Sequence, residues 1–113
     1  MKSYTDIEQS KKLAEILPLE SADMCYPLPC EDGDKPLLEQ GEFGSTPCWS
    51  LAALLDYLRK IELFPSMETD GDEVIMYISC YNADGIYTID TKAADFVDAY
   101  CDMIIKLHEL KLL

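Results

Sequence analysis

Hydrophobic residues recur with a helical spacing near the start of the chain. In "YTDIEQSKKLAEIL" the apolar face consists of Ile7, Leu13, Ala14, Ile16 and Leu17. Thr5 and Glu8 match a capping box, in which the two side chains bond the first free backbone N–H groups. Pro18 cannot continue a helix, so the pattern predicts a helix that ends after Leu17.

A second helical pattern, "LAALLDYL", predicts a helix over roughly residues 51–62. Thr46 could cap it, with Pro47 at the first helical position. Ser50 is the preferred cap, because Trp49 and Leu54 then stand at the two positions of a hydrophobic staple.

Strand patterns occupy much of the rest. "EVIMYISCY" (73–81) is rich in β-branched and aromatic residues, and "IYTIDT" returns after a turn at "NADG". "SADMCYPL" (21–28) predicts a short extended segment. The last helix starts at Thr91 or Asp95 and presents a stripe containing Phe96, Val97, Tyr100, Ile104 and Leu107.

These elements predict a single α+β domain over residues 1–113, in the order α-β-α-β-β-α. Three helices would pack on a small antiparallel sheet, made of a hairpin and one further strand. Prolines, glycines and acidic residues gather at about 28–47, which predicts an irregular acidic loop.

Charge is the most unusual global property. Twenty-two acidic residues against nine basic ones give a net charge of −13, and residues 13–34 and 61–91 contain no Lys or Arg. Such a chain repels phosphate backbones and anionic membranes, which argues against direct binding to nucleic acid or membrane. The charge serves solubility, or it forms an acidic face for a basic protein partner.

Cytoplasmic localisation is expected, because the N-terminal residues lack the apolar core of a signal peptide and no apolar run has the length of a membrane span. The cysteines are odd in number and widely spaced, which is typical of reduced, buried residues: Cys25, Cys30, Cys48, Cys80 and Cys101.

Cys48 precedes Trp49 and an apolar helix, as the nucleophile of a papain-like protease does. Gln40 even stands where such enzymes place an oxyanion-hole glutamine. A thiol nucleophile also needs a histidine base, and His108 lies deep in the last helix. A buried Cys48 beside a helix cap is therefore the preferred interpretation, with a cysteine hydrolase as an alternative.

No catalytic, cofactor or metal site emerges from the other residues. Cys25 and Cys30 form a close pair, but zinc sites need a second one. "EDGDK" and "ETDGDE" do not continue as calcium loops, so they are interpreted as acidic turns. We expect no cofactor and no bound metal.

"PCWSLAALLDYL" and the closing "IIKLHELKLL" resemble a group of small uncharacterised prophage and mobile-element proteins of Bacteroidetes. The resemblance rests on Trp49-Ser50-Leu51 and the leucine-rich helix after them, and covers about a third of the chain. It implies a phage-related context and no particular activity.

The sequence thus favours a non-catalytic, acidic protein-interaction domain, with a protein partner or a second copy of itself as the bound species. A DNA-mimic inhibitor, whose carboxylates imitate phosphates, is the alternative suggested by the charge of −13.

Overall fold

The computed structural model describes residues 2–26, 35–37, 46–82 and 85–112. Within these residues the elements follow the order α1 (Ile7–Ala14), the short 3-10 helix η1 (Leu19–Ser21), β1 (Met24–Tyr26), β2 (Thr46–Cys48), α2 (Leu51–Lys60), β3 (Ser66–Asp70), β4 (Glu73–Asn82), β5 (Gly85–Ala93) and α3 (Phe96–Glu109). The predicted α+β class, with three helices and a small antiparallel sheet, is confirmed.

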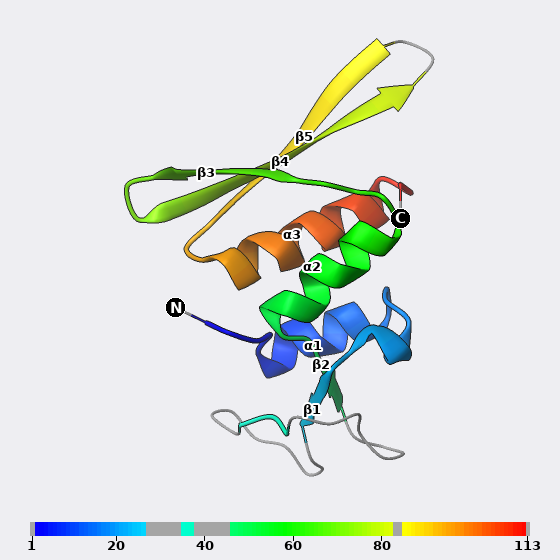
Figure 1. Ribbon diagram of the computed structural model, residues 1–113, viewed down its shortest axis with the longest axis vertical. Helices are drawn as coiled ribbons and strands as arrows, with labels where there is room; N and C mark the ends of the chain where they lie inside the picture. Colours follow the sequence, from blue (N-terminus) through cyan, green and yellow to red (C-terminus); the bar gives the residue numbers. More distant parts are fainter. Residues whose placement is uncertain (1, 27–34, 38–45, 83–84, 113) are drawn as a thin grey trace.

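The three-stranded sheet has the order β3-β4-β5, and β1 pairs with β2 in a separate two-stranded sheet. Figure 1 shows α3 against one face of the larger sheet and α2 beside α3, with α1 beyond them and the β1–β2 pair at the far end. The main core lies between that sheet and the helices, and includes Trp49, Leu54, Leu58, Met76, Ile78, Val97, Met103 and Leu107.

The first helix is capped one residue later than predicted. Asp6 is the N-cap, and its side chain forms a capping box with Gln9 in place of the expected pair Thr5 and Glu8. The backbone N–H of Thr5 donates to the carbonyl of Trp49 at 2.9 Å, and its side chain is buried. The sequence fits a capping box at Thr5 and Glu8 as well as one at Asp6 and Gln9. The long-range hydrogen bond to Trp49 selects the second. The helix ends at Ala14, and turns continue from there to Pro18.

The other two caps follow the sequence prediction. Ser50 caps α2 by accepting a hydrogen bond from the N–H of Ala53, which rules out Thr46 as the cap. Trp49 and Leu54 both lie in the main core, as the staple requires. Asp95 caps α3 by accepting from the N–H of Asp98, so Thr91 belongs to β5.

The expected irregular loop at 28–47 lies largely outside the described residues, but its last two residues belong to β2. Pro47 made a strand unexpected, because proline has no N–H for a sheet. Cys25, which opposes Pro47, exchanges both of its backbone hydrogen bonds with Leu37 instead, at 3.0 and 2.7 Å. The ladder therefore needs no N–H from Pro47.

A second unexpected strand, β3, pairs with β4 through a two-residue turn at Gly71 and Asp72. Gly71 has φ +64°, a conformation that glycine adopts without steric cost. "ETDGDE", interpreted only as an acidic turn, is therefore a turn with parts of both flanking strands. The β4–β5 hairpin extends beyond the helices (Figure 1). No helix in the described part of the chain is long and apolar enough to cross a bilayer.

Candidate functional site

Helix α2 forms a ridge between two hollows in the surface. Its core side carries Leu54 and Leu58, which are buried. Ala52, on the outer side, lines both hollows. One of them is apolar and the other is rich in carboxylates, so the two sides of the same helix offer different chemistry.

We call the first hollow the apolar groove. It has a volume of about 520 Å³ and is lined by Leu51, Ala52, Leu55, Met67, Phe96 and Tyr100. These residues come from the start of α2, from β3 and from the start of α3. Leu55 and Met67 are each 41% exposed, although both are large and apolar. Exposed apolar side chains that share one concave surface are typical of an interaction site.

The position of Met67 follows from the register of the sheet. Met67 opposes Met76, which is fully buried, so both side chains lie on the face of the sheet that covers the helices. β3 is an edge strand, and its inward Met67 lines the groove together with residues from the start of α2 and α3. β3 therefore forms one wall of the groove. The sequence patterns did not predict this strand.

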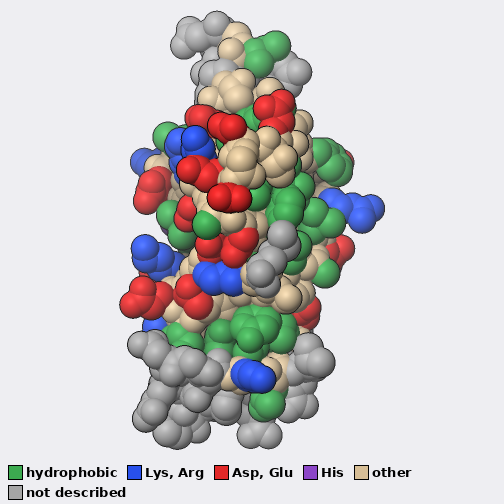
Figure 2. All heavy atoms as spheres, turned by 90° about the vertical axis from the view of Figure 1, so that its left-hand side faces the viewer, with side chains coloured by type: hydrophobic (Ala, Val, Ile, Leu, Met, Phe, Trp, Pro, Cys, Tyr) green, Lys and Arg blue, Asp and Glu red, His purple; other side chains and the backbone are tan. Residues whose placement is uncertain are grey.

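Acidic side chains lie on the outer face of β3, opposite the groove, and around the turn that follows the strand. Glu68 and Asp70 alternate with Met67 and Thr69 along β3, and Asp72 and Glu73 follow in the turn and on β4. Figure 2 shows hydrophobic side chains gathered at mid-height on this side of the molecule, with Asp and Glu side chains beside and above them. The negative potential of these carboxylates favours cationic partners.

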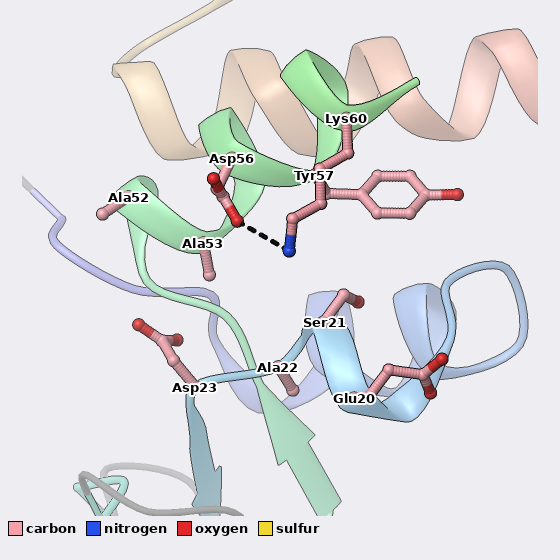
Figure 3. A pocket seen from close by; sticks show the side chains of 9 residues that line it. All are labelled: Glu20, Ser21, Ala22, Asp23, Ala52, Ala53, Asp56, Tyr57 and Lys60. Carbon is pink, nitrogen blue, oxygen red and sulfur yellow. Dashed lines mark ion pairs between the residues drawn. The ribbon is translucent and has the colours of Figure 1, made fainter. Parts of the chain in front are cut away.

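We call the second hollow the acidic pocket. Its volume is about 420 Å³, and it lies between α2 and the segment that contains η1 (Figure 3). Its lining residues are Glu20, Ser21, Ala22, Asp23, Ala52, Ala53, Asp56, Tyr57 and Lys60. Figure 3 shows Asp56 and Lys60 turned toward each other on one wall and Asp23 on the other.

The carboxylates of Asp23 and Asp56, in the acidic pocket, have structural partners. Asp23 accepts hydrogen bonds from the backbone N–H and the hydroxyl of Ser50, which fixes the N-terminus of α2. Asp56 forms a 3.1 Å ion pair with Lys60. Among the described residues, no cluster of His, Cys, Asp and Glu has the arrangement of a metal site.

Cys48 lies in a buried polar cluster at the junction of α1, β1 and β2, and it is 0% exposed. Its thiol donates to the carbonyl of Thr5 at 3.4 Å. Thr5 Oγ1 lies 2.8 Å from Ser10 Oγ and accepts from the N–H of Trp49 at 3.2 Å. The hydroxyl of Tyr26 donates to the same Thr5 carbonyl at 2.7 Å. These bonds join the N-terminal segment to β1 and β2.

Burial raises the pKa of the Cys48 thiol above its ordinary value of 9.0, although hydrogen bonds from Thr5, Ser10 and Tyr26 act in the opposite direction. A catalytic cysteine needs a lowered pKa and access to substrate. His108, the histidine that a thiol nucleophile would need as its base, is exposed in the last turn of α3. The prediction of a buried Cys48 beside the helix cap is confirmed, and the geometry gives the nucleophile no support.

A polar network ties the N-terminal segment to the start of α3. Lys2 Nζ donates to Asp98 at 2.7 Å and to Asp6 at 3.1 Å, and the amide of Gln9 also donates to Asp98 at 2.7 Å. Partial burial of Asp98 acts to raise its pKa, but the hydrogen bonds from Lys2 and Gln9 outweigh this and lower it below 3.8. The network holds α1 against α3.

In comparisons with protein-family models, curated proteins and solved structures, nothing matches this chain. The resemblance to mobile-element proteins of Bacteroidetes therefore stays a prediction. The residues of the apolar groove were not predicted as a group. The signal available for them was the Asp70-Gly71 dipeptide, which is typical of a hairpin turn and would have indicated β3.

Proposed function

We propose that this chain is a non-catalytic interaction domain that binds a protein partner in the apolar groove. The observation that supports this most strongly is the exposure of Leu55 and Met67 in a concave surface whose lining includes the partly buried Phe96 and the buried Tyr100. Aromatic and Met side chains of this kind form the centres of protein interfaces. We further propose a cytoplasmic protein of phage or mobile-element origin, as the resemblance through Trp49-Ser50-Leu51 implies.

The charge distribution suggests that the partner carries a positive charge. From residue 61 to 91 the chain contains no Lys or Arg, and this stretch includes β3. A basic partner gains from the resulting attraction during its approach, and the apolar groove holds it after water has been displaced. A second copy of this chain is the alternative occupant, and it brings the same negative charge.

A capture experiment with matched variants tests this function. Tagged wild-type protein is incubated with lysate of the source cells at low and moderate salt, beside Leu55→Asp and the control Leu19→Asp. Leu19 is 62% exposed and lies outside the groove, so the control introduces the same charge in place of the same side chain.

We expect a partner that stays bound at moderate salt, is lost with Leu55→Asp and is retained by Leu19→Asp. If both variants retain every captured protein, the groove is not the binding surface and the proposal is wrong.

The proposal of a DNA mimic predicts a different result. Glu68, Asp70, Asp72 and Glu73 follow one another around the β3–β4 turn, and such a run can imitate a row of phosphates. A nucleic-acid enzyme captured through these groups would be released by moderate salt, because the contact would be electrostatic. It would also be retained by Leu55→Asp.

A further inference from the structure

The outer edge of β3 is open for pairing. In the described part of the chain, the larger sheet has the order β3-β4-β5, and no strand lies beyond β3. All five residues of β3 are exposed. An open edge offers a row of backbone N–H and C=O groups to an incoming strand.

The register identifies which groups of β3 point outward. Asp70 and Glu73 close a two-residue turn, so they form a hydrogen-bonded pair, and such pairs alternate with non-hydrogen-bonded pairs along the ladder. Met67 and Thr69 belong to the non-hydrogen-bonded pairs. Their N–H and C=O groups therefore face away from β4, toward the open edge.

The opposite edge of the sheet is covered at one of the corresponding positions. Asp90, on β5, stands opposite Tyr77 in a pair whose backbone groups also face away from β4. Lys106 on α3 donates from Nζ to the Asp90 carbonyl at 2.8 Å. A lysine at a strand edge hinders pairing with another chain. β5 is protected in this way, whereas the charged side chains of β3, Glu68 and Asp70, are both carboxylates.

The apolar groove lies under the same edge. Met67 is both an outward-facing backbone position of β3 and a lining residue of the groove. A strand added beside β3 would direct every second side chain toward Leu51 and Leu55. Its other side chains would stand beside Glu68 and Asp70, on the outer face of the sheet.

We infer that the partner binds as an extended segment that pairs with the outer edge of β3 and alternates apolar with cationic residues. The apolar side chains enter the groove, and the Lys or Arg side chains meet Glu68 and Asp70. This inference rests on the proposed function, since it names the kind of partner that the groove takes. Strand addition to an open sheet edge, with pockets for alternate side chains, is a recurring mode of peptide recognition.

Charge argues against a second copy of this chain at the same edge. Pairing of β3 with β3 of another molecule would bring Glu68 and Asp70 close to the same carboxylates of the partner. Like charges across neighbouring strands destabilise the pair. Two chains of −13 also repel each other on approach.

A selection from a library of random peptides displayed on phage tests the inference. Wild-type protein is the target, and each enriched peptide is then synthesised and its dissociation constant measured for wild type and four variants. Thr69→Pro removes an outward N–H of β3 and leaves the hydrogen-bonded pairs with β4 in place. Thr88→Pro is the matched control, because Thr88 is exposed and occupies the corresponding outward position on β5. Leu55→Asp tests the groove.

We expect enriched peptides with apolar residues at every second position and Lys or Arg between them. Their affinity should fall by about tenfold or more with Thr69→Pro and with Leu55→Asp, and stay within about twofold with Thr88→Pro. Glu68→Lys, which leaves the backbone unchanged, should weaken the same peptides by about fivefold or more even if Thr69→Pro disturbs the fold.

Peptides with a spacing of three or four residues, sensitive to Leu55→Asp but not to Thr69→Pro, would overturn strand addition and leave the groove as the binding site. Binding insensitive to Leu55→Asp, or no enrichment at all, would count against both the inference and the proposed function.

Discussion

The ammonium group of Lys106, on α3, donates a hydrogen bond of 2.8 Å to the backbone carbonyl of Asp90, on β5. The bond joins a helix in the centre of the fold to the outer edge of the sheet. It occupies a carbonyl that would otherwise be available to a neighbouring strand. The two edges of the sheet therefore differ, and that of β3 lies beside the apolar groove.

Removal of this lysine should expose the β5 edge. Lys106→Met keeps the aliphatic stem and removes the charge, so the free energy of unfolding should change by less than about 1 kcal/mol. Aggregation on heating should become faster, because edge lysines oppose strand pairing. Light scattering during a temperature ramp measures this, with Lys11→Met on α1 as a control of equal charge. Equal aggregation of the two variants would show that Lys106 does not protect the edge.

The buried cluster around Thr5 should contribute strongly to stability. Thr5→Val keeps the shape but removes the hydroxyl, which leaves Ser10 and the N–H of Trp49 without their buried partner. A loss of about 2 kcal/mol in the free energy of unfolding is expected. Urea denaturation measures it, and Thr88→Val, at an exposed strand position, should stay within about 0.5 kcal/mol of wild type. A loss no larger than that of the control would contradict the importance of the cluster.

The thiol of Cys48 should be inert in the native protein. Burial removes access and raises its pKa, and the pKa of Cys101 is likewise raised by burial, to about 12. Alkylation with iodoacetamide at neutral pH, read at each cysteine by mass spectrometry, should label both far more slowly than free cysteine. Labelling should become complete in denaturant. A native Cys48 that reacts faster than free cysteine would revive the hydrolase hypothesis.

Stability should fall in acid partly through Asp98. Its pKa is lowered in the folded state, so its ionised form stabilises the fold above the unfolded-state pKa of about 4. This contribution is lost as the pH falls through the folded-state pKa. Asp98→Asn should therefore be less stable than wild type at neutral pH, and the difference should shrink below about pH 4 in urea denaturation experiments.

Asp102, on the same helix, supplies a control whose pKa is shifted in the opposite direction. Burial and the charge of Asp98 raise its pKa, so its ionised form costs stability at neutral pH. Asp102→Asn should stabilise the protein near pH 7, and this gain should vanish in acid. If both asparagine variants shift stability in the same direction at all pH values, the assigned pKa directions are wrong.

Sequence patterns predicted the elements whose signals are local. Ser50 and Asp95 cap their helices as expected, because a side chain and an N–H three residues later suffice to make the bond. The cap of α1 was displaced from Thr5 to Asp6, because a hydrogen bond to distant Trp49 places Thr5 in the core. No local pattern contains that information.

The groove depends on contacts that are still more distant in the sequence. β3 contains one apolar residue, Met67, and therefore lacks the repeated apolar–polar alternation in sequence that predicts a strand. β2 contains Pro47, which has no N–H to donate. The pairing of β1 with β2 tolerates it because Cys25, opposite Pro47, forms its backbone hydrogen bonds with Leu37. Leu55, Met67 and Phe96 come together through the packing of three separate elements. The exposure of Leu55 and Met67, which suggests the function, is visible only in the folded chain.

The most direct test of the central claim is an NMR titration of isotope-labelled protein with a peptide or partner segment that it binds. We predict that the backbone amide shifts concentrate at the start of α2, along β3 and at the start of α3, around Leu55, Met67 and Phe96. Shifts confined to the outer face of the sheet, or to the acidic pocket around Asp23 and Lys60, would contradict the assignment of the apolar groove as the binding surface.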